Sequence, residues 1–167
     1  MTNISPDLYH QIITHIPIAC VDIAIISNRS VLLVKRNDEP AKGQWWLPGG
    51  RVYKGEMMRD TAKRKALEEV GLKCEVGPLI YTAETVFEDG PNGIPVHSIN
   101  SCFLLKIVGG QLELDNHHGD WRCVSQHSFS KFDLHPYVVK CLLAAFLNDT
   151  ARDVHDLDRD GDGRACE

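Results

Sequence analysis

The sequence predicts an α+β domain, an α-β-α sandwich in which helices flank a mixed central β-sheet. Residues 18–27 and 31–35 are rich in β-branched side chains and enclose Asn28-Arg29-Ser30, a pattern typical of a β-hairpin. Residues 56–70 and 136–147 carry helix start and stop signals instead. A chain of 167 residues, 43% hydrophobic and 25% charged, suits one globular domain with a sizeable core.

The N-terminal part is expected to open with a helix. Ser5 supplies a capping hydroxyl, Pro6 suits the first turn, and Asp7 places an acid near the helix start. The helix should end before Pro17, where the hairpin begins. Residues 36–46 then form a loop before the next helix.

A second helix is predicted after a turn built on Gly49 and Gly50. It should start near Glu56, and Gly71 should end it after Val70. Glycine tolerates positive φ, so it suits both a tight turn and a helix C-terminus.

The rest of the chain should alternate strands with loops before a last helix. We expect strands at 73–76, 79–87, 96–108, 111–114 and 121–124, loops at 88–95 and 115–120, and a helix from His135-Pro136 to Leu147.

Composition indicates which binding partners and which cellular location to expect. The net charge of −5 gives no reason to expect non-specific nucleic-acid binding, so an anionic substrate would need local positive charge. His15, Pro17 and Asp22 interrupt the apolar stretch 12–26, so no membrane segment is expected, and a cytoplasmic location follows. The cysteines form no C-x-x-C pair and are expected to be buried free thiols; they are Cys20, Cys74, Cys102, Cys123, Cys141 and Cys166.

The end of the second helix carries the residues with the clearest chemistry. Positions 65, 68 and 69 stand at i, i+3 and i+4 and so share one face, and two of them are the carboxylates Glu68 and Glu69. The Gly49-Gly50 turn can bring backbone carbonyls close to them. Hard oxygen ligands on a rigid element suit Mg²⁺ bound to a phosphate-bearing substrate.

The spacing of this segment resembles the Nudix box. The chain reads Gly50-x5-Glu56-x7-Arg64-Lys65-Ala66-x-Glu68-Glu69-x-Gly71-Leu72, and the family pattern is G-x5-E-x7-R-E-U-x-E-E-x-G-U with U apolar. Every fixed position matches except Lys65, where the family has a glutamate. The chain is therefore identified as a member of the Nudix family, which implies a Nudix fold over residues 1–148 and hydrolysis of a nucleotide derivative.

The flanks of the box resemble the GDP-mannose mannosyl hydrolase branch. The similarity rests on Lys35-Arg36-x3-Pro40-Ala41-x-Gly43-x-Trp45-x2-Pro48-Gly49-Gly50-Arg51-Val52-x-Lys54-x-Glu56, on Asp22, and on residues 115–122. In that branch water attacks the anomeric carbon of the sugar, whereas most Nudix enzymes cut a phosphoanhydride by attack at phosphorus. The implied substrate is a small-molecule nucleotide sugar, and the branch often forms homodimers.

The resemblance also implies a metal site for Mg²⁺, with Mn²⁺ as an alternative. The Gly49 carbonyl and the Glu69 carboxylate would bind the ion, and His117 stands at the position of a third ligand. Glu68 is a further candidate ligand, although the mannosyl hydrolases lack an acid there. Arg64, one turn before Glu68, would orient the carboxylates.

Catalytic and substrate-binding roles carry over in the same way. His118 would be the general base, since imidazole titrates near neutral pH. Arg36 and Arg51 would hold the diphosphate, and Asp22 would interact with the sugar. Trp45 is a candidate for stacking on the substrate, although either Trp45 or its neighbour could instead be a core residue.

Several alternatives remain open on the sequence alone. His117 and His118 could exchange roles under a one-residue slip, and Glu56 is expected to pair with Arg64 rather than bind metal. Lys65 could be a solvated lysine, or it could oppose a second cation and so disfavour attack at phosphorus. The rival functions are a pyrophosphohydrolase that depends on Glu68 and a non-catalytic nucleotide-sugar-binding module.

Residues 149–167 form an acidic C-terminal tail. The run Asp156-x-Asp158-x-Asp160-Gly161-Asp162-Gly163-x-Ala165-Cys166-Glu167 matches an EF-hand loop and resembles the ending of the excalibur calcium-binding domain. Ca²⁺ binding is one interpretation of this loop, and a disordered acidic tail is the other.

Overall fold

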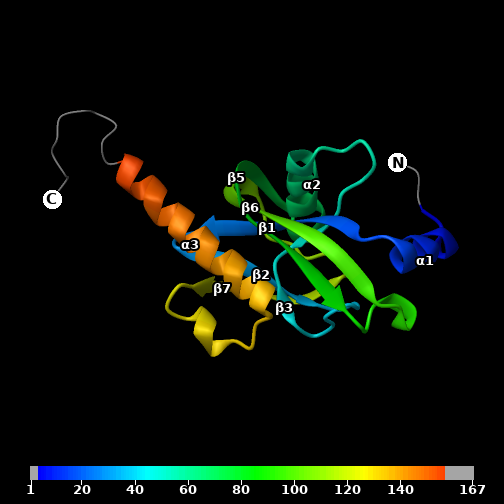
Figure 1. Cartoon of the computed structure of the whole chain (residues 1–167). Helices are drawn as coiled ribbons and strands as arrows, with labels where there is room; N and C mark the ends of the chain where they lie inside the picture. Colours follow the sequence, from blue (N-terminus) through cyan, green and yellow to red (C-terminus); the bar gives the residue numbers. More distant parts are fainter. Residues whose placement is uncertain (1–3, 157–167) are drawn as a thin grey trace.

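The computed structural model describes residues 4–156, with side chains described through Asp149 (Figure 1). The helices are α1 (Pro6–His15), α2 (Met58–Val70) and α3 (Pro136–Asp156). The strands are β1 (Ile18–Ser27), β2 (Ser30–Arg36), β3 (Trp45–Trp46), β4 (Gly49–Arg51), β5 (Leu72–Phe87), β6 (Val96–Gly110) and β7 (His118–Ser125).

The strands form one seven-stranded mixed sheet. The order is β3-β2-β1-β6-β5, with β4 paired to β1 and β7 paired to β2. β1 and β6 are parallel from Ile18 opposite Ser98 to Ile26 opposite Lys106, and the other pairs are antiparallel. The structure confirms the predicted α+β class and its mixed sheet.

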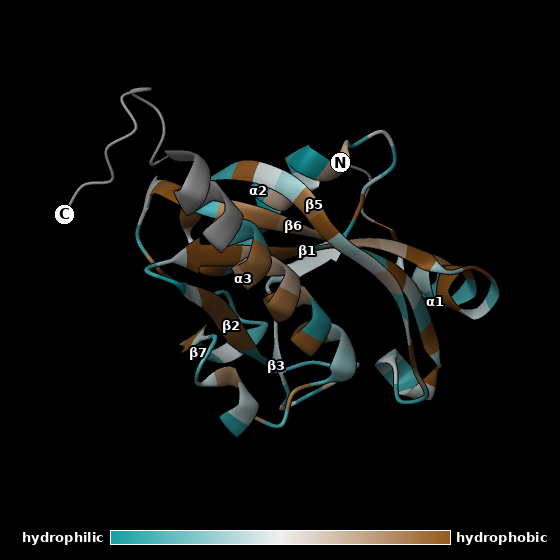
Figure 2. Ribbon diagram, turned by 60° about the vertical axis from the view of Figure 1, so that its left-hand side comes forward, coloured by the Kyte–Doolittle hydropathy of each residue, from teal (hydrophilic) through white to brown (hydrophobic). Residues whose placement is uncertain are grey.

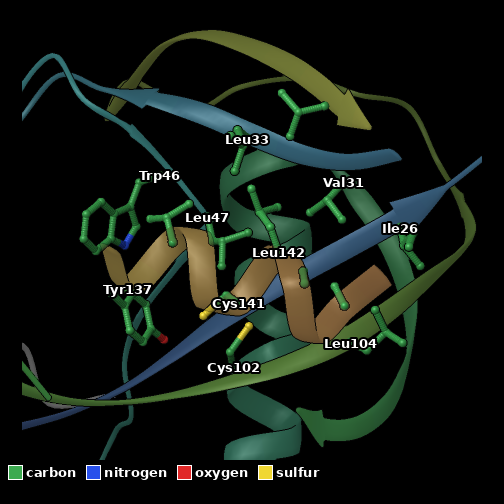
Figure 3. Close-up of a cluster of buried hydrophobic side chains, with 14 of the residues drawn as sticks. Ile26, Val31, Leu33, Trp46, Leu47, Cys102, Leu104, Tyr137, Cys141 and Leu142 are labelled. Carbon is green, nitrogen blue, oxygen red and sulfur yellow. The ribbon is translucent and has the colours of Figure 1, made fainter. Parts of the chain in front are cut away.

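Helices cover both faces of the sheet. α3 packs on one face over a core that includes Leu104, Cys141 and Leu142 (Figure 3). In Figure 2, much of α3 and of the strands behind it has the colours of hydrophobic residues. On the opposite face, α2 presents Ala62, Ala66 and Val70, whose small size allows the helix to approach the strands closely. The sheet is thus the middle layer of a sandwich.

The first helix and the hairpin form as predicted. Ser5 Oγ accepts a hydrogen bond from the Leu8 N–H at 3.3 Å, and Pro6 occupies the first turn. α2 ends at Gly71, whose φ of 68° is left-handed. A Cβ there would lie 2.5 Å from the Gln111 carbonyl oxygen, so the position also requires glycine for space.

Several element boundaries differ from the prediction. The predicted loops 36–46 and 115–120 contain β3 and the start of β7, the predicted glycine turn is part of β4, and α2 begins at Met58 rather than near Glu56. β5 runs without a break through Gly77-Pro78, where register shifts absorb the irregularity. Residues 111–114 are not a strand, because the Glu113 N–H bonds to the Val70 carbonyl at the end of α2. α3 continues past Leu147 to Asp156, with no glycine or proline there to end it.

The boundary expected at residue 148 therefore falls within α3. The EF-hand-like loop lies outside the described residues beyond its first position. None of the helices in the described part of the chain has the length and apolar character needed to span a membrane.

Candidate active site

A pocket of about 310 Å³ opens where β1, β4 and the end of α2 meet the β5–β6 pair. It gathers seven of the residues predicted from the sequence, and Lys65 with them: Asp22, Arg36, Gly49, Arg51, Glu69, His117 and His118. Arg64, Glu68 and Trp45 do not line it. The fold thus brings together residues that lie up to a hundred positions apart in the sequence.

Glu69 is the buried carboxylate of this pocket, with 6% of the residue exposed. Its Oε2 accepts a hydrogen bond from the Gly49 N–H at 2.9 Å. Its Oε1 accepts one from the Lys65 ammonium at 2.8 Å. Both carboxylate oxygens therefore have positively polarised partners, which offset the cost of burying the charge.

The two glycines before α2 let the backbone approach its neighbours. A Cβ on Gly49 would lie 2.4 Å from the Val21 carbonyl oxygen, and one on Gly50 would lie 2.6 Å from Cε of Lys65. Side chains at these positions would push β4 away from β1 and displace Lys65. The Gly49-Gly50 pair is therefore required by the packing of the site itself.

His118 is held by a carboxylate. It begins β7, pairs with Arg36 across a register shift in β2, and has a side chain only 5% exposed. Its Nδ1 lies 2.7 Å from Asp115 Oδ1, and its Nε2 lies 3.8 Å from Glu69 Oε2. Because a carboxylate only accepts hydrogen bonds, Nδ1 carries the proton in this pair, and Nε2 can accept one from a group in the pocket.

His117 stands differently from its neighbour. Its side chain is 73% exposed and pairs through Nδ1 with Asp38 at the rim of the pocket. The hydrogen bond to Asp38 raises the pKa of the imidazole, and burial opposes this effect only in part. The structure thus distinguishes the two histidines, since only His118 is both buried and turned toward Glu69.

Three basic side chains line the pocket, and they are Arg36, Arg51 and Lys65. Arg36 is anchored by its Nε, which donates to the Pro40 carbonyl at 2.8 Å. The Arg51 guanidinium lies 4.3 Å from the centroid of the Tyr9 ring. With the Lys65 ammonium, these side chains give the pocket three cations that could face phosphate oxygens.

Asp22 is a buried carboxyl on β1, and 5% of the residue is exposed. The Tyr137 hydroxyl donates to its Oδ2 at 2.7 Å, and Tyr137 lies at the start of α3 beside Trp46 (Figure 3). Burial raises the pKa of Asp22 to about 7; the Tyr137 hydrogen bond opposes this shift, and the charge of Glu69 adds to it. The group can therefore change its protonation state near neutral pH.

Arg64 lies behind the pocket and holds the loop of the box together. Its Nε and one terminal nitrogen bond to the two oxygens of Glu56 at 2.7 and 2.8 Å, and its other terminal nitrogen bonds to Glu68 at 2.9 Å. It also donates to the Arg51 carbonyl at 3.1 Å. The guanidinium holds the pKa of Glu56 down at about 2. The expected pairing of Glu56 with Arg64 is therefore present, and Arg64 also orients Glu68.

One tryptophan is a core residue and the other is partly exposed, as expected, but the candidate for stacking on the substrate, Trp45, does not line the pocket. Trp45 packs edge-on against Phe132, with the Arg122 guanidinium 5.3 Å from its ring, and lies outside the pocket. Trp46 is 6% exposed, stacks with Tyr137 and lines the pocket. Neighbouring residues of a strand face opposite sides, so only one of them can face the ligand.

The sequence pattern missed several residues of the site, among them Asp115, which orients His118. Tyr137 gave no signal because its bond to Asp22 joins elements far apart in the chain. Thr85, Ser98 and Asn100 also line the pocket. No signal in the sequence marked them, because on these strands the polar residues are buried while the apolar neighbours Val86 and Ile99 are exposed.

Glu69 could hold a divalent metal ion at this pocket. Within the described residues, no group of three or more His, Cys, Asp or Glu side chains converges as a metal site. Mg²⁺ usually takes one or two carboxylates and completes its shell with water and phosphate oxygens. Glu69 is buried at the pocket, accepts a hydrogen bond from the Gly49 N–H, and could serve as such a carboxylate ligand. The ion and the Lys65 ammonium would then both interact with the Glu69 carboxylate.

Comparison with known proteins agrees with the family expected from the sequence. The NUDIX domain model matches residues 17–144. The low-salt glycan biosynthesis protein Agl8 of Haloferax volcanii is 32% identical over 143 residues, which cover 84% of this chain and 90% of that protein. The ADP-ribose pyrophosphatase of Methanocaldococcus jannaschii is 36% identical over 97 residues, which cover 58% of this chain and 55% of that protein.

Solved structures share the fold. A MutT NUDIX hydrolase from Burkholderia pseudomallei superposes with a TM-score of 0.68 at 23% identity, over 78% of this chain and 98% of that one. A UDP-X diphosphatase superposes with a TM-score of 0.61 at 15% identity, over 89% and 74%. The box on α2, the sandwich around it and the domain match together place this chain in the Nudix family of hydrolases.

Proposed function

We propose that the protein is a Mg²⁺-dependent hydrolase of nucleotide sugars that converts GDP-mannose and water to GDP and mannose. The observation that carries this proposal is the His118 imidazole, which Asp115 orients from behind and which lines one pocket with Glu69 and Asp22. A buried imidazole oriented by a carboxylate is suited to take a proton from water. The name of the Haloferax relative, a glycan biosynthesis protein, agrees with a sugar-containing substrate.

In this reaction His118 Nε2 accepts a proton from water as the water oxygen bonds to the anomeric carbon. The bond from that carbon to the diphosphate oxygen breaks, and its electron pair leaves with GDP. Asp115 keeps the imidazole oriented and stabilises the imidazolium that forms. Asp22, buried beside the pocket, is placed to bind a sugar hydroxyl or to offset positive charge on the ring.

The departing diphosphate carries extra negative charge, and the pocket supplies cations for it. Arg36 and Arg51 can bind phosphate oxygens through their guanidinium groups, and Lys65 adds a third positive charge. Preorganised positive charge stabilises a leaving group most where water is excluded.

Nudix hydrolases use divalent metals, and the proposal assigns Mg²⁺ to Glu69 and the Gly49 carbonyl. When bound, the ion would polarise the diphosphate as a Lewis acid. Glu68 is 46% exposed and engaged by Arg64, so its share in binding is smaller. His117 pairs with Asp38 at the rim and is the outermost of the candidate ligands.

A second candidate function is cleavage of the phosphoanhydride by attack at phosphorus. Glu68 and Glu69, both present on α2, and the name of the Methanocaldococcus relative favour it. Against it stands Lys65, whose ammonium lies 2.8 Å from Glu69 and 3.7 Å from Glu68. An ammonium at this point repels the additional cation that a multi-metal site would need.

The test is a product assay with GDP-mannose and Mg²⁺ in ¹⁸O-labelled water. GDP together with labelled mannose would support attack at carbon. GMP with label in a phosphate product would establish attack at phosphorus and reject the proposal. Turnover of other nucleotide sugars without turnover of GDP-mannose would reject the assigned substrate but leave the type of reaction to be read from its products.

A further inference from the structure

The pocket has a neutral end that the proposed chemistry does not use. Thr85 on β5 and Ser98 and Asn100 on β6 line it, and each is at most 7% exposed. Asn100 Nδ2 donates to Thr85 Oγ1 at 2.9 Å, and Thr85 Oγ1 lies 2.8 Å from Ser98 Oγ. We call these three residues the neutral triad.

The neutral triad interrupts an otherwise apolar face of β6. Alternate residues of a strand share a face, so Ser98 and Asn100 continue the row that holds Cys102 and Leu104. Cys102 and Leu104 lie in the core under α3 (Figure 3). The row becomes polar where it enters the pocket. Buried polar groups weaken a core unless hydrogen bonds satisfy them, and these three bond to one another. Their remaining donors and acceptors line the pocket, which suits a polar ligand.

The triad and His118 lie on opposite sides of β1, and Arg36 and Arg51 lie on the same side as His118. In the register of the sheet, Arg51 on β4 stands opposite Cys20 on β1, and Cys20 stands opposite Asn100 on β6. Neighbouring strands are about 5 Å apart, so the backbones of Arg51 and Asn100 are separated by about 10 Å. His118 lies in the other direction, on β7 beside β2.

Aromatic rings lie on both sides of this end of the pocket. Phe87 follows Thr85 on the same face of β5, and Tyr9 enters from α1 with Arg51 against its ring. Aromatic faces bind flat rings by stacking, and a carboxamide offers a donor and an acceptor side by side to a polar ring edge. In the described part of the chain, the side chain of Asn100 bonds to no other side chain than Thr85.

We propose that the neutral triad is the subsite for the nucleobase of the substrate, read by the Asn100 carboxamide and the two hydroxyls. The inference rests on the proposed function, because it takes the ligand to be a diphosphate with its reacting carbon near His118. The group at the other end of that diphosphate is then the nucleoside, and it extends over β6 and β5. The triad carries no charge, which matches an uncharged base.

The test compares ligands that contain the base with ligands that lack it. Isothermal titration calorimetry with Mg²⁺ would measure binding of GDP, UDP, mannose 1-phosphate and inorganic pyrophosphate to Asn100→Ala and Thr85→Val. The control is Thr82→Val, the same change at an exposed position of β5. Thermal unfolding followed by circular dichroism shows whether each variant folds, and Thr85→Val keeps the side-chain shape if Asn100→Ala does not fold.

The affinity of at least one nucleoside diphosphate should fall about tenfold or more in the triad variants, and pyrophosphate affinity should stay within about twofold. Parallel losses for both ligands, or no loss for either, would overturn the inference. So would a loss confined to mannose 1-phosphate, which would assign the subsite to the sugar. Because no turnover is needed, a failure of the proposed reaction would not change this result.

Discussion

Lys65 is the counter-ion of Glu69, with its ammonium nitrogen 2.8 Å from Oε1 of the carboxylate. The two residues are one turn apart on α2, and the stem of Lys65 passes against Gly50. The family pattern has a glutamate in this position, so this chain places a fixed positive charge where a further carboxylate would otherwise stand. That exchange alters both the electrostatics of Glu69 and the number of cations the pocket can hold.

Replacing Lys65 by glutamate should raise the number of bound divalent ions. The variant would remove the ammonium and add a carboxylate beside Glu68 and Glu69, so Mn²⁺ titration followed by electron paramagnetic resonance should find more ions per chain. Phosphoanhydride cleavage should appear among the products. Lys63→Glu, at an exposed position of the same helix, is the control. Unchanged stoichiometry and products would remove Lys65 from this role.

Loss of the His118 imidazole should lower kcat strongly. His118→Ala removes the proposed base and should reduce kcat for GDP-mannose by a factor on the order of 10²–10⁴, with a smaller change in KM. Asp115→Asn should also reduce kcat, since Asp115 orients the ring. His127→Ala, at an exposed position, is the control. An active His118→Ala variant would contradict the assignment.

Asp22 should make stability depend on pH. Its pKa is raised from 3.8 to about 7 in the folded protein, so its protonated form favours folding. This contribution is full below pH 4 and is lost as pH rises through 7. Between pH 5 and pH 8 the free energy of unfolding of the metal-free protein should fall by about 2–3 kcal/mol from this group.

In the Asp22→Asn variant, the free energy of unfolding should not show this decrease between pH 5 and pH 8, because an amide does not ionise. The amide oxygen can still accept the hydrogen bond from the Tyr137 hydroxyl. Urea unfolding at several pH values would measure the free energy of unfolding, with Asp60→Asn on the exposed part of α2 as the control. Equal pH profiles for the wild-type protein and Asp22→Asn would show that Asp22 does not titrate in this range.

The Arg64–Glu56 pair should stabilise the box more than it serves catalysis directly. Their side chains are 12% and 17% exposed, and the guanidinium bonds to both carboxylate oxygens. Arg64→Ala should reduce the free energy of unfolding by about 2–3 kcal/mol, since charge-assisted hydrogen bonds are lost and Glu56 is left unpaired. Arg64→Lys should restore only part of this, because an ammonium cannot form the fork. Chemical denaturation of both variants, with Lys63→Ala at an exposed position of the same helix as control, checks the prediction.

The ionisation of Glu56 should make the stability of the Arg64–Glu56 pair depend on pH in the acid range. Its pKa is lowered from 4.5 to about 2, so the stability it provides is present above pH 4.5 and is lost as pH falls through 2. Glu56→Gln should therefore be less stable than the wild-type protein at pH 6, and the difference should narrow toward pH 2. A constant difference over this range would mean that the ionised pair is not its source.

The fold class and most of the helices and strands could be predicted from the sequence. The box was identified by its resemblance to the Nudix pattern. Helix periodicity predicted which of its residues share a face, and the glycines predicted where its turn and its helix C-terminus lie. Turn signals and β-branched runs located the hairpin and the strands. The ends of elements were less predictable, as the continuous β5 and the extended α3 show, because packing and neighbouring hydrogen bonds decide where they stop.

Only the tertiary structure decided which candidates meet. It separated His118 from His117 by burial, and it placed Trp46 rather than Trp45 at the pocket. It brought Tyr137 from α3 to Asp22 on β1, and it set Thr85 opposite Ser98 on adjacent strands. These contacts depend on strand register and on which face a helix covers, and such long-range pairings leave no local trace in a single sequence.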